Sequence, residues 1–220
     1  MDNRRDIHGD APDLLRVNAG SIIEFNRCRR SHAPAEGTVV MVKQVLFVRG
    51  GGEGAHAEDA KLARSLQSEL GRGYKVHFPM MPNEQSPEYA AWRDRLSETL
   101  AALGDDAVLV GHSLGASVLI KMLVDQEGRQ AGRGLFLIAA PYWGDQGWAW
   151  EDVELPKDAG ARLSLPLFFF HSRDDEIVPY AHLDLYLKMF PHARMRRLSG
   201  RNHQLDDDLS EVAADIMTLG

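Results

Sequence analysis

The clearest chemical feature of the chain is a serine flanked by glycines. Residues 111–115 read Gly-His-Ser-Leu-Gly, directly after the apolar run 107–110 and before the helical pattern 116–123. A serine on so sharp a strand-to-helix turn is forced into a strained backbone, and the glycines let neighbouring segments approach it closely. The helix N-terminus then faces the serine hydroxyl. We therefore predict that Ser113 is a nucleophile and that the amide of Leu114 stabilises the oxyanion it forms.

A second glycine-rich segment, residues 50–55, follows the apolar run 45–48 and opens a helical pattern. Its spacing also fits a dinucleotide-binding fingerprint, which requires an acidic residue at the end of the next strand to bind the ribose hydroxyls. Residues 74–79 contain none. The sequence therefore disfavours a nicotinamide cofactor, and we predict no cofactor.

The elements that must position these loops are short and alternate in type. Six β-rich runs are separated by helical patterns, one of which repeats Leu62, Leu66 and Leu70 at every fourth position. The runs are 45–48, 74–78, 108–110, 135–138, 167–170 and 195–198. This alternation predicts an α/β fold with a six-stranded, mostly parallel sheet, helices on both faces and chemistry at the carboxyl ends of the strands.

Capping residues predict where several helices begin and end. Ser86-Pro87 predicts a helix start, with the serine as N-cap and the proline at the first helical position. Gly71, Gly104 and Gly128 lie where helices should stop, and the acidic run 206–208 predicts the start of the last helix.

The serine turn in this setting resembles the α/β-hydrolase superfamily, over nearly all of residues 43–219. More narrowly, the chain resembles compact, lidless serine hydrolases related to the retinoblastoma-binding serine hydrolase, on its short glycine loop and its Met81-Pro82 segment before the serine. The resemblance implies a catalytic domain over residues 41–220 without a large cap domain. It also implies the chain order serine, acid, histidine.

The resemblance directs the search for the acid and base to the loops after the last two strands. The first loop matches the family's Asp-x-x-Val-Pro pattern with the acid at Asp175, although Asp174 and Glu176 are close rivals. The second fits the family's Gly-x-x-His pattern with the base at His203. Ser113, Asp175 and His203 each lie within a few residues of a strand's carboxyl end, so one edge of the sheet should bring them together.

The resemblance also assigns a second oxyanion amide to the first glycine loop. Superfamily members often have a His-Gly pair here, whereas this chain has Arg49-Gly50, which leaves Gly51 as the expected donor. Among the other histidines, His112 should point away from the serine hydroxyl and His171 should support the acid loop. The nine histidines lack paired ligand spacing such as His-Glu-x-x-His, so no metal site is predicted.

Three of the four tryptophans lie in residues 140–156, after a central strand. Tyr142, Trp143, Trp148 and Trp150 either line the substrate pocket or pack this segment onto the domain, since aromatic side chains do both. The segment is too short for a large lid, so we expect small acyl substrates rather than long-chain lipids.

Composition limits the partners and the cellular compartment. The 220 residues are 44% hydrophobic and 26% charged, typical of a globular protein, and the net charge of −7 disfavours nucleic acids and anionic membranes as partners. Cys28 is the only cysteine, and the chain has no apolar run of membrane-spanning length. We therefore predict a cytoplasmic protein. Residues 1–40 hold six arginines and six acidic residues, which predicts a weakly structured extension.

Together these features predict a serine hydrolase that cleaves small carboxylesters through an acyl-enzyme intermediate. Thioesters, amides and acyl transfer use the same machinery and stay open. A protein-binding module with secondary hydrolase activity is the alternative from another class, although nothing in the sequence marks a protein partner.

Overall fold

The computed structural model describes residues 41–126 and 130–219. The predicted extension, residues 1–40, lies outside the described residues, as does Gly128. Within the described part, no helix has the length and apolar character needed to cross a membrane.

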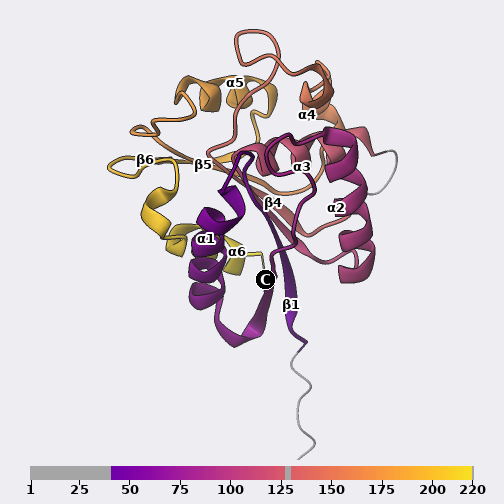
Figure 1. The fold of residues 1–220 in the computed structure, drawn as a ribbon, viewed down its shortest axis with the longest axis vertical. Helices are drawn as coiled ribbons and strands as arrows, with labels where there is room; N and C mark the ends of the chain where they lie inside the picture. Colours follow the sequence, from indigo (N-terminus) through magenta and orange to yellow (C-terminus); the bar gives the residue numbers. More distant parts are fainter. Residues whose placement is uncertain (1–40, 127–129, 220) are drawn as a thin grey trace, which may run out of the picture. The chain divides into compact units, whose positions relative to one another are not determined.

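Strands and helices alternate along the described chain (Figure 1). The strands are β1 Lys43–Val48, β2 Tyr74–His77, β3 Val108–His112, β4 Gly134–Ile138, β5 Leu167–Ser172 and β6 Arg194–Leu198. The α-helices are α1 Ala55–Leu70, α2 Tyr89–Leu103, α3 Leu114–Asp125, α4 Ala159–Arg162, α5 Ala181–Met189 and α6 Ser210–Met217.

The six strands form one sheet in the order β2-β1-β3-β4-β5-β6, and every neighbouring pair is parallel. This confirms the predicted α/β architecture, with all of the described strands parallel rather than most of them. The central strands β3, β4 and β5 are buried along their whole length, because helices cover both faces of a parallel sheet.

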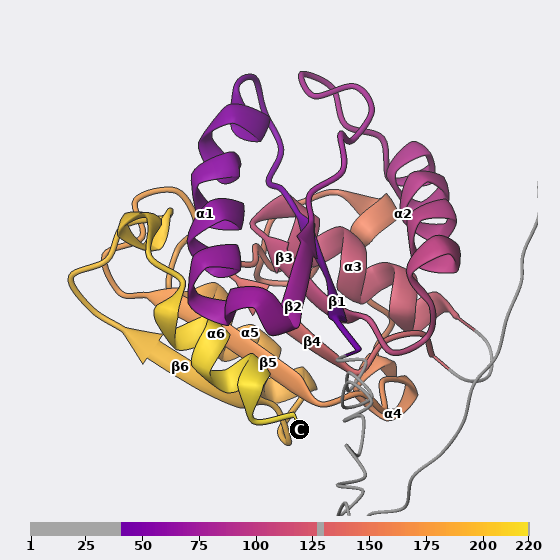
Figure 2. The ribbon, with the colours of Figure 1, turned by 90° about the horizontal axis from the view of Figure 1, so that it is seen from below.

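Two apolar layers hold the helices against the sheet. Helices α1 and α6 pack together on one face, where Leu66 and Ile216 join Phe47 and Phe136 in one buried cluster (Figure 2). Helices α2, α3 and α5 contribute to the opposite cluster, which includes Trp92. These stripes are the ones that the helical spacing of the leucines predicts.

Two predicted helix starts are wrong. Helix α2 begins at Tyr89, because Glu88 is extended and accepts the first helical bond from Trp92 N, while Ser86 N donates to Asn83 O in a preceding turn. Helix α6 begins at Ser210.

The acidic run 206–208, which was predicted to start the last helix, does not have α-helical backbone angles throughout. Leu205, Asp206 and Asp207 have positive φ values of 48°, 53° and 57°, which an α-helix does not allow, and Asp206 N donates to the Asn202 side chain at 3.0 Å. The predicted helix ends at Gly71 and Gly104 are confirmed, with φ of 66° and 84°.

Candidate active site

Ser113 lies on the turn between β3 and α3. Its φ of 51° and ψ of −121° lie in a region that side-chain-bearing residues rarely adopt. The turn is held by a hydrogen bond of 2.8 Å from Ser113 N to Ile138 O at the end of the neighbouring strand β4. The strained backbone that the motif predicts is therefore present, and it is anchored to the centre of the sheet.

The two glycines around Ser113 are required by backbone packing. A Cβ atom on Gly115 would collide with the carbonyl oxygens of Arg49 and Val48, so only glycine lets α3 lie against the end of β1. A Cβ atom on Gly111 would lie 2.6 Å from the Cα atom of Ala116. The first turn of α3 therefore lies close enough to the β1 loop for both to border one site.

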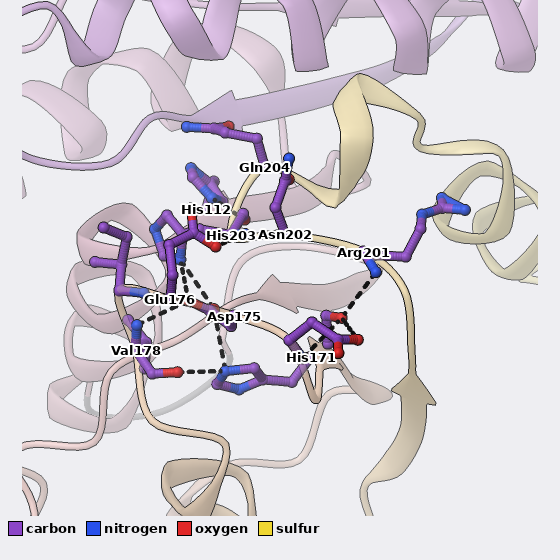
Figure 3. A network of polar contacts seen from close by, with 12 residues as sticks. His112, His171, Asp175, Glu176, Val178, Arg201, Asn202, His203 and Gln204 are labelled. Atoms are coloured by element: carbon purple, nitrogen blue, oxygen red, sulfur yellow. Dashed lines mark hydrogen bonds and ion pairs between the residues drawn. The ribbon is translucent and has the colours of Figure 1, made fainter.

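His203 and Asp175 meet at the same edge of the sheet, on the loops after β6 and β5 (Figure 3). The Nδ1 atom of His203 lies 3.0 Å from Oδ1 and 2.9 Å from Oδ2 of Asp175. Asp175 Oδ1 also accepts hydrogen bonds from the amides of Ile177 and Val178, at 2.9 and 2.8 Å. The carboxylate is thus held rigidly beneath the imidazole.

His171 supports the acid loop, as predicted. Its Nε2 atom lies 3.2 Å from Asp175 Oδ2 and 3.0 Å from the carbonyl oxygen of Val178. Burial by itself raises the pKa of Asp175, but the hydrogen bonds from His171 and His203 outweigh it and hold this pKa well below its ordinary value. Asp175 is therefore an anion throughout the neutral range.

The two rivals of Asp175 bind backbone instead of the imidazole. Asp174 Oδ2 accepts a hydrogen bond from Gly200 N, and Glu176 Oε2 accepts one from His203 N at 3.2 Å. Both carboxylates therefore hold the loop that carries His203. Among Asp174, Asp175 and Glu176, only Asp175 contacts the ring of His203.

A buried pair that the sequence analysis missed lies beneath the serine turn. His112 Nδ1 is 2.8 Å from Asp59 Oδ2, and both side chains are 1% exposed. Both ring nitrogens of His112 contact groups other than Ser113, and its Nε2 atom lies 3.1 Å from the carbonyl oxygen of His203. One sequence signal pointed to Asp59, since it is an acidic residue on the stripe of α1 that carries Leu62 and Leu66.

Both ring nitrogens of His112 face oxygens that only accept hydrogen bonds, so the ring must carry two protons to satisfy them. Burial by itself lowers the pKa of His112 and raises that of Asp59. The attraction and hydrogen bond between them outweigh burial, so the pKa of His112 lies above its ordinary value and that of Asp59 below. The contacts of the pair therefore favour an imidazolium beside a carboxylate.

The glycine loop after β1 leaves the amide of Gly51 without a hydrogen bond to the described residues. Gly50 N donates to Asp59 Oδ2 at 2.7 Å, and Gly52 N donates to Glu84 O at 3.2 Å. Gly51 N, between them, has no hydrogen-bond partner among the described residues. Gly51 also packs so closely on Leu114 that a Cβ atom would lie 2.6 Å from its Cδ2 atom. The loop thus brings a free amide beside the first turn of α3.

A cavity of about 320 Å³ lies over these residues. Its lining combines the serine, the histidine and the glycine loop with several glutamates. The lining residues are Gly50, Gly51, Glu53, Gly54, Ala55, Glu58, Asp59, His112, Ser113, Glu176, Ile177, His203 and Gln204. Ser113 Oγ makes no hydrogen bond to any described residue, and catalytic hydrogen bonds commonly tighten only when substrate binds.

The four aromatic residues predicted as pocket candidates do not line this cavity. Trp143 Nε1 donates to Ser117 Oγ of α3 at 2.8 Å, and Trp148 packs edge-on against His182 of α5 at 5.3 Å between ring centroids. Tyr142 and Trp150 pack against the core cluster that α2, α3 and α5 share. The interpretation that holds in this structure is the packing one: the rings attach the segment to α3 and α5.

No group of three or more histidine, cysteine, aspartate or glutamate side chains within residues 41–126 and 130–219 is arranged to hold a metal ion. His203 contacts Asp175, and His203 and Ser113 both line the cavity.

Comparisons with known proteins identify the family and the fold. A family model described as "Serine hydrolase" matches residues 57–205. A comparison with curated protein sequences gave no match.

Solved structures share the fold at low sequence identity. The ydeN gene product of B. subtilis superposes with a TM-score of 0.64 at 21% identity, over 80% of this chain and 98% of that one. The 2-hydroxy-6-oxo-6-phenylhexa-2,4-dienoate hydrolase BphD of Rhodococcus sp. strain RHA1 gives 0.64 at 17% identity, over 82% and 91%. Est1E of Butyrivibrio proteoclasticus gives 0.60 at 14% identity, over 80% and 87%. The predicted α/β-hydrolase fold is confirmed, and the described residues contain no large cap domain.

Proposed function

The chain belongs to the serine hydrolase family, and from this premise we propose that it cleaves small carboxylesters through an acyl-enzyme intermediate. The observation that carries the proposal is the hydrogen bond from the buried Asp175 to His203, which lines the same cavity as Ser113 and Gly51. An acid-supported imidazole beside a strained serine is the arrangement that activates a hydroxyl for acyl transfer.

In the acylation step, Ser113 Oγ attacks the ester carbonyl carbon while His203 Nε2 takes the hydroxyl proton. The carbonyl π electrons move to oxygen, and the amides of Gly51 and Leu114 bind the resulting oxyanion. Collapse of this intermediate breaks the bond to the alkoxy leaving group, which departs as an alcohol with the proton from His203. Water then attacks the acyl-serine with the same proton transfers, which releases the carboxylic acid and restores Ser113.

Asp175 orients this base. Its contact with Nδ1 leaves Nε2 of His203 to face the cavity, and its negative charge stabilises the imidazolium that forms in the transition state. The pKa of Asp175 lies below its ordinary value, so the carboxylate stays charged across the pH range in which an imidazole base works.

The cavity supports a limit on substrate size and charge. Its volume of about 320 Å³ lies near the lower end of small-molecule sites. Glu53, Glu58 and Glu176 border it, and no lysine or arginine is among the lining residues. Small neutral or cationic esters fit this field better than anionic ones.

The proposal is tested with a fluorophosphonate probe, which reacts with an activated serine. We expect the wild-type protein to be labelled and the Ser113→Ala and His203→Ala variants to lose labelling while they keep the wild-type circular dichroism spectrum. A folded wild-type protein that is not labelled, or labelling that survives Ser113→Ala, contradicts the proposal. A panel of matched p-nitrophenyl esters, thioesters and anilides then identifies the leaving group by kcat/KM.

A further inference from the structure

Arg49 has an unusual place for an arginine. It follows β1 directly, and its side chain is completely buried beneath the glycine loop. Its guanidinium donates to Met81 O at 3.2 Å, lies 3.9 Å from Glu84 Oε1, and stacks over the Trp92 ring at 4.9 Å from the centroid. A charged group is seldom fully buried unless it is paired, so this one has a structural or functional reason.

The shortest contact of this guanidinium is to the glycine loop. Arg49 Nη1 donates to the carbonyl oxygen of Gly50 at 2.7 Å. That carbonyl and the N–H of Gly51 belong to the same peptide group. Because a trans peptide is planar and its C=O and N–H point in opposite directions, a fixed Gly50 carbonyl also fixes the direction of the Gly51 N–H.

The other peptide group of Gly50 is fixed too. Gly50 N donates to Asp59 Oδ2 at 2.7 Å, and Asp59 is held in turn by His112 at 2.8 Å. Gly50 is therefore held at its N–H by a buried anion and at its C=O by a buried cation. Glycine would otherwise leave this segment with more backbone freedom than any other residue.

We propose that Arg49 is a positioning residue, which aims the Gly51 N–H at the oxyanion by holding the Gly50 carbonyl on the opposite side of the peptide. The inference rests on the proposed acyl-enzyme chemistry. Arg49 occupies the position of the histidine that often precedes this glycine in α/β-hydrolases. Without the guanidinium, the Gly50–Gly51 peptide is free to rotate and the oxyanion loses part of one donor.

The test is the Arg49→Met variant, which keeps the length and apolar stem of the side chain but removes every donor. Loss of an oxyanion donor typically lowers kcat by about 10²–10³-fold, and a misdirected donor should lower it by about 10- to 100-fold with little change in KM. Arg49→Lys keeps one donor for the Gly50 carbonyl, so we expect it to recover part of the lost kcat.

A purely structural role for Arg49 would also lower activity, so a second readout is needed. The readout is the ratio of kcat/KM for a p-nitrophenyl ester to kcat/KM for its thionoester, in which sulfur replaces the carbonyl oxygen. Sulfur accepts hydrogen bonds more weakly than oxygen, so a working oxyanion site favours the oxygen ester and a damaged one narrows the ratio. The ratio does not depend on the fraction of folded protein, because both esters meet the same sample. For kcat itself, the labelling endpoint of the fluorophosphonate probe gives the concentration of active sites.

Asp215→Asn serves as the matched control. Asp215 is buried on α6 and pairs with Arg196 of β6 at 2.6 Å. Helix α6 covers the opposite face of the sheet from α3, so loss of this ion pair should lower stability without changing the ratio. We expect Arg49→Met to narrow the ratio and Asp215→Asn to leave it at the wild-type value.

Three outcomes overturn the positioning role. One is a wild-type ratio in Arg49→Met; another is a kcat within about threefold of the wild type, far short of the loss of a donor. If Arg49→Met does not fold, the Arg49→Leu variant, which also lacks every donor, decides, and a wild-type ratio and kcat in that variant contradict the role. Failure of the wild-type protein to react at Ser113 is a different result, because it removes the proposed function itself.

Discussion

The Nδ1 atom of His203 contacts both carboxylate oxygens of Asp175, at 3.0 and 2.9 Å, although 28 residues separate the two in the chain. The loops after β5 and β6 meet here because those strands are parallel neighbours. Asp174 and Glu176, on either side of Asp175, bind the backbone of the histidine loop instead.

This relationship predicts how Asp175 and Asp174 differ. Asp175→Asn should lower kcat by about 10³–10⁴-fold, because the amide stabilises neither the required tautomer nor the imidazolium. Asp174→Asn should cost far less, since its amide oxygen still accepts the bond from Gly200 N. Steady-state kinetics of ester hydrolysis gives kcat for both variants. A larger loss of kcat in Asp174→Asn than in Asp175→Asn would show that Asp175 is not the acid.

The close packing at the serine turn predicts that Gly115 tolerates no side chain. Gly115→Ala should lower the free energy of unfolding by at least about 2 kcal/mol, because the added methyl group meets the backbone oxygens of Arg49 and Val48, which cannot rotate away. Gly73→Ala is the matched control, since a Cβ atom there meets nothing within 4 Å. It should change stability by less than about 1 kcal/mol in urea unfolding. Equal losses in the two variants would contradict the close approach of α3 to β1.

The Asp59–His112 pair predicts a pH-dependent contribution to stability. The lowered pKa of Asp59 stabilises the fold above about pH 4, and this contribution is lost as pH falls through the folded-state pKa. The raised pKa of His112 stabilises the fold below about pH 6.5, and this contribution is lost as pH rises through its folded-state pKa.

Both contributions are complete between these limits. The stability lost in the double variant Asp59→Asn/His112→Gln should therefore be largest between about pH 4 and 6.5 and shrink on either side. Urea unfolding of both proteins from pH 3 to 9 measures this. A loss that is constant over the whole range would show that the pair is uncharged.

The glutamates around the cavity predict selectivity for substrate charge. Among p-nitrophenyl esters of matched size, the anionic one should have the lowest kcat/KM, and its deficit should shrink as added salt screens the carboxylates. Glu53→Gln, which removes one exposed charge, should narrow the difference at low salt. An anionic ester that is hydrolysed fastest would contradict this reading of the lining.

The tryptophan segment predicts a change in stability without a change in substrate binding. Trp143→Phe keeps the ring but removes the hydrogen bond of 2.8 Å to Ser117 Oγ, at an expected cost of about 1 kcal/mol. The KM for a small ester should stay at the wild-type value, because Trp143 does not line the cavity beside Ser113. A several-fold rise in KM with unchanged stability would instead place the segment in the substrate pocket.

Local patterns were sufficient for the fold of this chain. Alternating β-rich and helical runs predicted the six strands, because the apolar period and the length of each run depend on residues close together in the sequence. The predicted helix starts at residues 86–87 and 206–208 were wrong because local sequence does not specify which hydrogen bonds the neighbouring turns make. Hydrogen bonds from neighbouring turns, such as that from Asp206 N to Asn202, took the place of the caps that the local sequence offered.

The site divides in the same way. The glycines around Ser113 identified the serine from five consecutive residues, and the resemblance pointed to Asp175 and His203. Which of three adjacent acids contacts the imidazole depends on the packing of two separate loops, and only the tertiary structure decided it. The same is true of the contacts of Arg49 and Asp59, which hold the C=O and the N–H of Gly50. Local sequence determines backbone conformation, whereas the direction of an amide or a carboxylate depends on long-range partners that sequence spacing does not specify.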